Sequence, residues 1–333
     1  MMKHQSPVRQ YGPVAIMAIA ITASMFAPQA ALGAEAFPSR PLRIVVPYAP
    51  GGSTDPIARL VGQQLTETLK QPVIVENRAG GGTMIGTELV QKSAPDGHTL
   101  LLASSSHAVN PALYKKVNYD PVKDFQAVSL AMSFPLLLTV NPNVPVRSVA
   151  ELVSQAQASP GKFAYASGGN GAANHLAGEM FKSLANVDLL HVPYKGGGPA
   201  LTDHIGGQVP LMFGSIVQSL QQVKGGKLRA LAVSGATRSS LAPEVPTISE
   251  AGVAGYNVTS WNAFVVPSAT PPAVVSALNT EIVRALRLPS TREQLAAQGA
   301  EPMPTTAKEA QDFIAAEVVK WARLVEKQNI HVE

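Results

Sequence analysis

Residues 43–56, which read RIVVPYAPGGSTDP, constrain the fold of this chain more than any other stretch. Their β-branched run predicts a buried strand, and the glycine pair predicts a tight turn after it. Thr54 or Asp55 is expected to cap a helix that begins at Pro56. Such a strand, glycine turn and helix start form an anion site. The free N–H groups of the first helical turn point outward, and glycines let an oxyanion approach the backbone.

The same pattern returns twice further along the chain. Residues 192–199, VPYKGGGP, repeat the spelling VPYxxGG of residues 46–52, and Pro199 again suits the first position of a helix. Residues 163–171, FAYASGGNG, form a third strand-to-glycine turn, which a helical pattern follows. We interpret the three turns as walls of one binding site, although glycines that only make a turn are commoner across proteins than glycines that approach a ligand.

Residues 1–36 have the pattern of a secretory signal peptide. Basic residues precede an apolar run over residues 14–27, and a small-x-small triplet predicts cleavage near Ala34 or Ala36. The alternative, a membrane anchor, needs about 20 apolar residues, more than this run supplies. Because the chain has no cysteine, it has no attachment point for a lipid and no disulfide. We therefore expect a mature protein, residues 37–333, that is free in the periplasm.

The composition limits the partners of the chain. The net charge of +4 is small, and no run of Lys or Arg with interleaved aromatic residues occurs. The chain therefore suits small anions and gives no indication of nucleic-acid binding. Its mature length suffices for two domains of ordinary size or for one large domain.

Strands are expected to alternate with helices from residue 42 onward. The pattern predicts strand 42–46, helix 56–69, strand 73–77, a helix that ends near residue 92, and strand 99–103. Such alternation indicates βαβ units with a parallel sheet, and ligands bind at the carboxyl ends of the strands in such sheets.

Two matching segments mark where the chain crosses between lobes. Residues 136–145 and 264–272 each predict a strand, prolines and a following helix. We place the first crossing near residue 136 and the return near residue 258. The predicted fold is an α/β protein of two lobes with a mainly parallel sheet in each. The first lobe consists of residues 37–135 and 258–333, including an amphipathic helix over residues 307–326, and the second lobe of residues 136–257.

Several longer motifs resemble one protein family. They are FPSRP at 37–41, VPYAPGG at 46–52, VENRAGGG at 75–82, NYDP at 118–121, HVPYKG at 191–196 and VPTI at 245–248. Because these motifs extend over the mature chain, the chain as a whole resembles the tripartite tricarboxylate transporter substrate-binding proteins, also called the Bug type.

The resemblance implies a periplasmic solute receptor with the type II-like fold of two-lobed binding proteins. In that fold a strand hinge joins the lobes, which close on the ligand like a flytrap. The resemblance also implies a small carboxylate ligand, such as a di-, tri- or aromatic carboxylic acid, and delivery to membrane transporter subunits or to a sensor protein. It further implies a protein without cofactor, metal or catalytic activity, and we expect a monomer.

The resemblance also implies which residues contact the ligand. In the first lobe they are Tyr48, Ala49, Gly51, Gly52, Ser53, Thr54, Asp55, Gly82, Thr83, Ser104 and Ser106, and in the second lobe Ser167, Asn170, Asn174, Tyr194, Lys195 and Gly196. Many family members carry an aspartate after the strand at residues 210–213. This chain has Gly214 and Ser215 there, and we place both at the ligand. The missing acid disfavours a ligand with an ammonium group.

Some of these residues keep a second interpretation. Asp55 is explained at least as well as the cap of the helix that follows it. Lys195 could pair with a distal carboxylate, but a lone loop lysine is more often solvated. The histidines show no metal-ligand spacing, so we interpret them as capping or packing residues: His98, His107, His175, His191 and His204.

An enzyme is the alternative class of protein. Ser167 lies in YASGG, which lacks the first glycine of a nucleophile elbow, and the glycines of residues 80–86 miss the dinucleotide spacing by one residue. A secreted hydrolase of small esters or amides with an unrecognised site is the alternative, and a module that binds surface polymers is a more remote one. The hydrolase predicts turnover, whereas the receptor predicts saturable binding of a ligand that is recovered unchanged.

Overall fold

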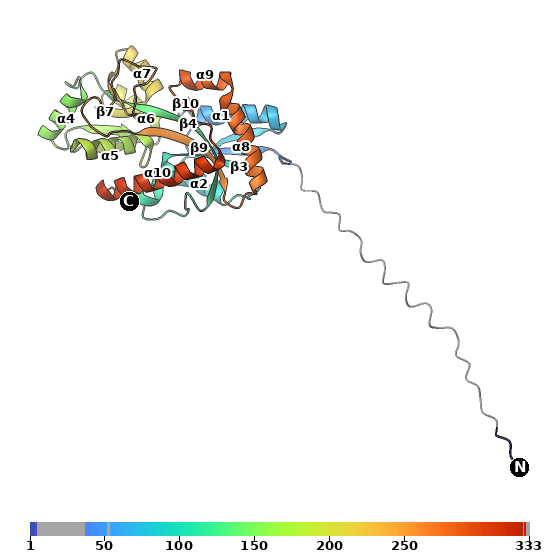
Figure 1. Cartoon of the computed structure of the whole chain (residues 1–333). Coiled ribbons are helices and arrows are strands. Elements are labelled where there is room, and N and C mark those ends of the chain that lie inside the picture. The colour runs from blue at the N-terminus through green and yellow to red at the C-terminus, as the bar shows by residue number, and fades with distance from the viewer. Residues whose placement is uncertain (5–36, 52–53, 329, 331–333) are drawn as a thin grey trace. The chain divides into compact units, whose positions relative to one another are not determined.

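The computed structural model describes residues 1–4, 37–51, 54–328 and 330. The chain divides into the units Met1–Ala36 and Phe37–Glu333, and the second unit contains the described helices and strands (Figure 1). The predicted signal peptide falls on residues 5–36, and two predicted site residues are Gly52 and Ser53. Both predictions lie outside the described residues. Among the helices that the structure describes, none is long and apolar enough to cross a membrane.

The first part of the compact unit alternates strands and helices, as the sequence pattern predicts. Its elements are β1 (Leu42–Val46), α1 (Thr54–Leu69), β2 (Val73–Asn77), the short 3₁₀ helix η1 (Gly81–Thr83), α2 (Met84–Gln91), β3 (Thr99–Ser104), α3 (Ser105–Leu113) and the long strand β4 (Phe125–Val140). The middle part repeats the alternation with α4 (Val149–Ala158), β5 (Ala164–Ser167), α5 (Ala173–Ala185), β6 (Leu190–Pro193), α6 (Gly197–Ile205), β7 (Leu211–Ser215), α7 (Ile216–Lys224) and β8 (Arg229–Val233). The last part contains β9 (Thr259–Pro267), α8 (Pro272–Arg287), α9 (Pro289–Ala297), β10 (Glu301–Pro302) and α10 (Ala307–Gln328).

The start of α1 differs from the prediction. The helix begins at Thr54 rather than at Pro56, so Thr54 and Asp55 lie in its first turn. The N–H groups of a first turn have no intrahelical partner, and the helix dipole favours an acidic residue such as Asp55 there. The prediction that one of these residues precedes and caps the helix is therefore wrong.

The helix α3 follows β3 directly, and the sequence pattern gave no indication of it. It begins with serines and contains Pro111, and these residue types have low helix propensity. Its buried face packs against α10, which comes almost two hundred residues later in the chain. Tertiary packing therefore stabilises a helix that local propensity does not predict.

The strands form one mixed sheet of ten strands in the described residues, in the order β2-β1-β3-β9-β4-β7-β5-β6, and β8 and β10 also pair with β4. The outer pairs β1–β2, β1–β3, β5–β6 and β5–β7 are parallel. The pairs that involve β4 or β9 are antiparallel. The parallel pattern predicted for each lobe therefore applies to the outer strands, where helices connect one strand to the next.

The long strand β4 belongs to both parts of the sheet. Residues 125–135 pair with β9, and residues 136–140 pair with β7 and β8. We use the predicted boundaries to define two lobes. Residues 37–135 and 258–333 are lobe 1, and residues 136–257 are lobe 2. In Figure 1 the green and yellow elements of lobe 2 lie to one side, and β4 and β9 run from them into lobe 1.

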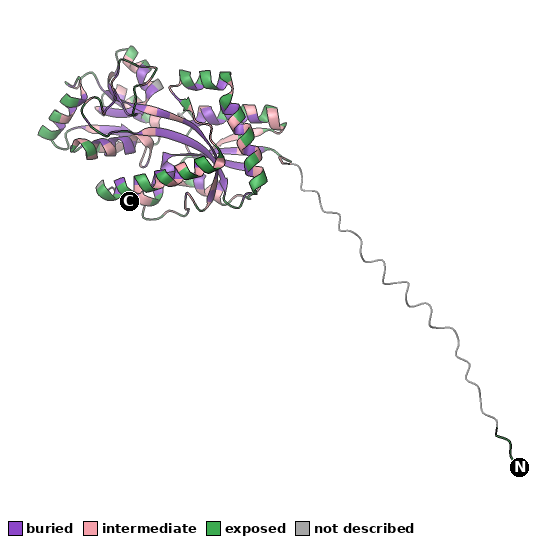
Figure 2. Cartoon of the chain, viewed as in Figure 1, coloured by how far each residue is buried: buried purple, intermediate pink, exposed green. Residues whose placement is uncertain are grey.

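The core lies along these central strands, as the buried ribbon in Figure 2 shows. Apart from its first residue, β9 is buried throughout. Both tryptophans of the chain, Trp261 in β9 and Trp321 in α10, donate a hydrogen bond of 2.8 Å to the same carboxylate oxygen of Glu317. Lys320 forms an ion pair of 2.6 Å with the other oxygen of that carboxylate. The helix α10 is thereby fixed against the central sheet.

A buried serine joins the two segments that connect the lobes. The hydroxyl of Ser234 accepts from the Leu136 N–H at 2.7 Å and donates to the Val258 carbonyl at 2.6 Å. The backbone of Ser234 also pairs with both residues, because its N–H donates to Leu136 and its carbonyl accepts from Val258, each at 2.8 Å. This one residue therefore sets the spacing between the outgoing and the returning segment.

We expect Ser234→Ala to lower the free energy of unfolding by about 2–4 kcal/mol, because it leaves a buried N–H and a buried carbonyl without this partner. The measurement is urea denaturation followed by circular dichroism. The control is Ser154→Ala on the exposed face of α4, which should change stability by less than about 0.5 kcal/mol. Equal stabilities of the two variants would contradict this account of the junction.

Candidate functional site

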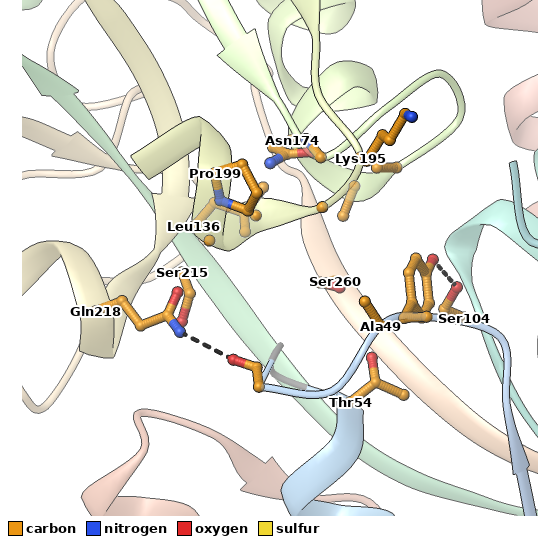
Figure 3. Close-up of a pocket in the computed structure, with 18 of the residues that line it drawn as sticks. Ala49, Thr54, Ser104, Leu136, Asn174, Lys195, Pro199, Ser215, Gln218 and Ser260 are labelled. Carbon is orange, nitrogen blue, oxygen red and sulfur yellow. Dashed lines mark hydrogen bonds between the residues drawn. The ribbon is translucent and has the colours of Figure 1, made fainter. Parts of the chain in front are cut away.

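A cavity of about 360 Å³ lies between the lobes. Figure 3 shows Ala49, Thr54 and Ser104 of lobe 1 on one side of it, and Asn174, Lys195 and Pro199 of lobe 2 on the other. Residues at or just after the carboxyl ends of β1, β3, β5, β6 and β7 all reach its wall. Ligands bind at these strand ends in sheets of this kind.

Several helices begin at the wall of the cavity. They are α1 at Thr54, α3 after Ser104, α5 after Ala172, α6 after Gly196 and α7 after Ser215. In α3, α5, α6 and α7 the residue before the helix makes no side-chain capping hydrogen bond. The preceding residues therefore do not cap the first N–H groups of these helices, although in α5 the His175 N–H donates to Asn174 Oδ1 at 3.2 Å. The positive ends of the helix dipoles converge on one volume. Such an arrangement attracts anions.

The side chains on the wall add little charge of their own. Among the described lining residues, Lys195 alone is charged, and its side chain is exposed. The wall also contains an apolar patch of Phe134, Leu136 and Met212. The cavity thus combines polar groups at the helix starts with apolar side chains.

The glycine turn of lobe 1 is held from behind by Asp55 and Asn77. The Asn77 side-chain amide donates to the Tyr48 carbonyl at 3.1 Å and to the Asp55 carboxylate at 2.9 Å. Burial opposes ionisation of Asp55, but hydrogen bonds from Arg59, Asn77 and the Gly51 N–H outweigh burial and lower the pKa of this carboxyl. Asp55 does not line the cavity. It braces the turn, a role that neither of its predicted interpretations described.

The structure brings together about half of the residues that the sequence analysis placed at the ligand. The predicted residues that line the cavity are Tyr48, Ala49, Gly51, Thr54, Ser104, Asn174, Lys195, Gly196 and Ser215. The described ones that do not line it are Asp55, Gly82, Thr83, Ser106, Ser167, Asn170, Tyr194 and Gly214.

Most residues of the second group have other partners. Gly82 lies against the Tyr114 ring, and a Cβ atom at Gly214 would lie 2.3 Å from the Ser219 hydroxyl. Tyr194 donates to Asp203 at 2.8 Å, and the Ser106 hydroxyl donates to the Gly171 carbonyl at 2.9 Å.

Further lining residues were not singled out as ligand contacts in the sequence analysis, although Pro50, Gly168, Gly197, Gly198 and Pro199 lie in the three glycine turns predicted as walls of the site. The further residues are Pro50, Ser105, Phe134, Leu136, Gly168, Ala172, Ala173, Gly197, Gly198, Pro199, Met212, Gln218 and Ser260. Gly197, Gly198 and Pro199 belong to the repeated glycine motif, so that motif was a signal for them. Phe134 and Leu136 lie on β4, and Ser260 lies on β9. No sequence motif marks these residues, because they line the cavity only through the path of the two strands in the fold.

The glycine loop of lobe 2 is supported by a pair of stacked histidines. The rings of His175 and His191 are stacked with centroids 4.1 Å apart. His191 Nε2 lies 2.6 Å from the Ser167 hydroxyl, and the Gly171 N–H donates to His175 Nδ1 at 3.1 Å. Burial lowers the pKa of His175 to about 4 and the pKa of His191 to about 3. Both imidazoles are therefore neutral at pH 7, as the hydrogen bond that His175 accepts requires.

Metal binding finds no support in the described part of the chain, where no group of three or more His, Asp or Glu could hold an ion. The histidines beside the cavity are engaged in ring stacking and in hydrogen bonds to the loop before α5.

The comparisons with known proteins agree with this geometry. An α/β fold of two lobes with a cavity between them is the architecture of periplasmic binding proteins, and solved structures of that kind resemble this chain. Within that class, the family model for the tripartite tricarboxylate transporter family receptor matches residues 57–330, and the chain belongs to this family.

Individual relatives cover most of the chain. Protein BugT of Bordetella pertussis is 39% identical, over 91% of this chain and 93% of its own length. The structure of R. palustris Rpa4515 with adipate is 35% identical, with a TM-score of 0.84, and covers 89% of this chain and 100% of its own. MatC of Rhodopseudomonas palustris with bound malate is 32% identical, with a TM-score of 0.80, and covers 87% of this chain and 100% of its own.

The histidine pair predicts how stability depends on pH. The pKa of His175 is lowered from 6.5 to about 4 on folding, so the unfolded chain binds protons first as the pH falls below about 6.5. The free energy of unfolding should therefore fall between about pH 6.5 and pH 4, by up to about 1.4 kcal/mol per pH unit for each proton that only the unfolded chain binds. His107 and His191 contribute in the same direction.

The test is urea denaturation of the wild type and of His175→Asn, whose side-chain oxygen can still accept from the Gly171 N–H. The variant should lose part of the slope because one titrating group is gone. Ile282→Val in the buried face of α8 is the control, since it should lower stability by about 1 kcal/mol at every pH without changing the slope. Parallel profiles for the wild type and His175→Asn would show that this imidazole does not contribute.

Proposed function

We propose that this protein is a periplasmic receptor that captures a small carboxylate between its two lobes. The observation that carries the proposal is the convergence of α1, α3, α5, α6 and α7 on one cavity. No carboxylate occurs among the described residues that line this cavity. Helix N–H groups with one nearby lysine attract a negative ligand, and no acidic side chain opposes it.

We infer a ligand whose carboxylates are separated by an apolar chain or ring. Most polar groups of the wall lie at the helix starts, and the wall also contains the apolar side chains of Phe134, Leu136 and Met212. A hydroxyl or ammonium group against that patch would lose hydrogen bonds to water without replacement. Gly214 and Ser215 provide no acid for an ammonium group. The bound adipate of Rpa4515 and the bound malate of MatC make dicarboxylates the first candidates.

We further propose that the loaded receptor acts without catalysis or cofactor and delivers its ligand to a membrane transporter of the tripartite tricarboxylate type. The family description supports this partner. A monomer with a signal peptide removed near Ala34 or Ala36 would suit this role. A sensor protein is the alternative receiving partner.

The hydrolase alternative would need a nucleophile that a substrate can reach. Ser167 and His191 form a close pair of the required types, but Ser167 is fully buried and neither residue lines the cavity. We therefore do not propose hydrolysis.

Thermal denaturation of residues 37–333 with a panel of ligands tests the receptor. Adipate, malate, citrate, benzoate and glutamate form the panel, with adipamide as the uncharged control. A ligand at a hundred times its dissociation constant should add about 2.7 kcal/mol, which raises the melting temperature by about 5 °C. We expect adipate to give a larger shift than malate or glutamate, and adipamide to give none. No shift with any carboxylate, together with no small acid released from the purified protein on denaturation, would refute the proposal.

Lys195 tests the contribution of the one charged wall residue. We expect Lys195→Gln to weaken binding of the dicarboxylate that the panel identifies by about threefold to fivefold, measured by isothermal titration, because an exposed charge pair contributes little. The loss should shrink as salt is added. Lys162→Gln makes the same charge change at an exposed site of lobe 2 away from the cavity and should leave affinity unchanged. An equal loss in both variants would mean that Lys195 acts only through net charge.

A further inference from the structure

Beside the cavity, the two lobes meet at a second place. The hydroxyl of Ser106, in α3 of lobe 1, donates to the carbonyl of Gly171, in the loop before α5 of lobe 2, at 2.9 Å. Neither residue lines the cavity. The contact therefore joins the lobes without using the space that a ligand would occupy.

Gly171 has no room for a side chain at this contact. Its φ of +76° favours glycine, and a Cβ atom there would lie 2.8 Å from Asn110 Oδ1, 3.3 Å from Leu113 Cδ1 and 3.4 Å from Val109 Cγ1. These three side chains all belong to α3. The backbone of lobe 2 therefore lies directly on a helix of lobe 1, which only glycine permits.

Asn110 is not free to move away from Gly171. Its side-chain nitrogen lies 2.7 Å from the Gly82 carbonyl and 3.3 Å from the Thr83 hydroxyl. Its side-chain oxygen is buried and, among the described residues, has no hydrogen-bond partner. The surface that receives Gly171 is therefore fixed within lobe 1 before the lobes meet.

A chain of hydroxyl groups connects this contact to the cavity. The Tyr48 hydroxyl lies 2.7 Å from the Ser104 hydroxyl and 2.9 Å from the Ser106 hydroxyl. Because Ser106 gives its one proton to the Gly171 carbonyl, it must accept from Tyr48, and Tyr48 must then accept from Ser104. Tyr48 and Ser104 line the cavity, so the direction of every hydrogen bond from the cavity to Gly171 is fixed.

A second contact across the cavity is weaker. Gln218 in α7 lies with its side-chain nitrogen 3.5 Å from the Gly51 carbonyl (Figure 3). This distance is at the limit of a hydrogen bond, and the long side chain of Gln218 loses rotamer freedom to make it. The Ser106–Gly171 contact, between a helix and a glycine backbone, is the more rigid of the two.

We propose that the contact between Ser106 and Gly171 is a latch that holds the lobes at the spacing seen in this structure, called closed below, whether or not a ligand is present. Ser106 and Gly171 are then positioning residues for binding, since they set the fraction of molecules whose cavity walls are assembled. Only this consequence for affinity rests on the proposed function. The apparent affinity for a ligand falls in proportion to the closed fraction.

The test measures the closed fraction directly and without a ligand. Because the chain has no cysteine, Ser154→Cys on α4 and Ser276→Cys on α8, both exposed, accept one fluorophore on each lobe for single-molecule energy transfer. We expect the closed state to dominate in the wild type. The closed-to-open ratio should fall about fivefold in Ser106→Ala, which loses one hydrogen bond, and further in Gly171→Ala, which inserts a methyl group between the lobes.

Gly161→Ala is the matched control. Gly161 has a similar φ of +72°, lies in lobe 2, and a Cβ atom there would contact only Asp188 Oδ2, at 3.4 Å. The control therefore introduces the same backbone strain without a wedge, and it should keep the closed fraction of the wild type. Circular dichroism of all four proteins establishes that they are folded.

Each outcome decides the proposal. A wild type that is open without ligand overturns it, and so does a closed fraction that is the same in the wild type, Ser106→Ala and Gly171→Ala. Loss of the closed state in both variants but not in Gly161→Ala supports it. Adding adipate is a separate arm. If adipate binds but the closed fraction does not depend on Ser106 or Gly171, the proposed receptor function is supported and the latch is refuted. If the closed fraction depends on both residues but no ligand of the panel binds, the latch is supported and the receptor function is refuted.

Discussion

The backbone pairing of β4 is the interaction on which the rest of the structure depends. Residues 125–135 of this one strand pair with β9 in lobe 1, and residues 136–140 pair with β7 and β8 in lobe 2. Because both parts of the sheet share this strand, the carboxyl ends of β1 and β3 and those of β5, β6 and β7 open toward the same space. The cavity follows from this sharing, and the residues of β4 at the change of partners, Phe134 and Leu136, form part of its wall.

The cavity attracts an anion mainly through backbone groups, which suits a protein that has to release what it binds. An arginine clamp would form charge-assisted hydrogen bonds, which are about twice as strong as neutral ones. Here the N–H groups at the starts of α3, α5, α6 and α7 supply a positive field without a cap, and Lys195 remains exposed. These groups belong to different lobes, so the field is complete only when the lobes are together. Opening of the lobes would divide this field and lower the affinity, so that release would require no change within either lobe.

The sequence predicted those features that depend on neighbours in the chain. The strand bounds of β1 and β2, the glycine turns and the lining residues Gly51, Lys195 and Gly196 follow from short motifs. The roles that depend on distant partners were missed. The Asp55 carboxylate accepts a hydrogen bond from Asn77 outside the cavity, and the Gly82 carbonyl accepts one from Asn110. Ser106 reaches Gly171 from α3, a helix that the packing of α10 stabilises. A motif specifies which residues stand at a turn, but only tertiary packing decides which of them face the ligand.

The proposed latch can act only if both of its sides are rigid, and each side has its own support. In lobe 1, α3 is packed under α10, which Glu317 fixes to the sheet through Trp261 and Trp321. In lobe 2, the N–H of Gly171 donates to the buried His175, whose ring is stacked on His191. A flexible loop in place of Gly171 would have to lose its own conformational entropy at each closure, and a single hydrogen bond of about 1 kcal/mol would not offset that loss. Because the loop is ordered within lobe 2 before closure, most of the free energy of the Ser106–Gly171 contact remains available to hold the lobes together.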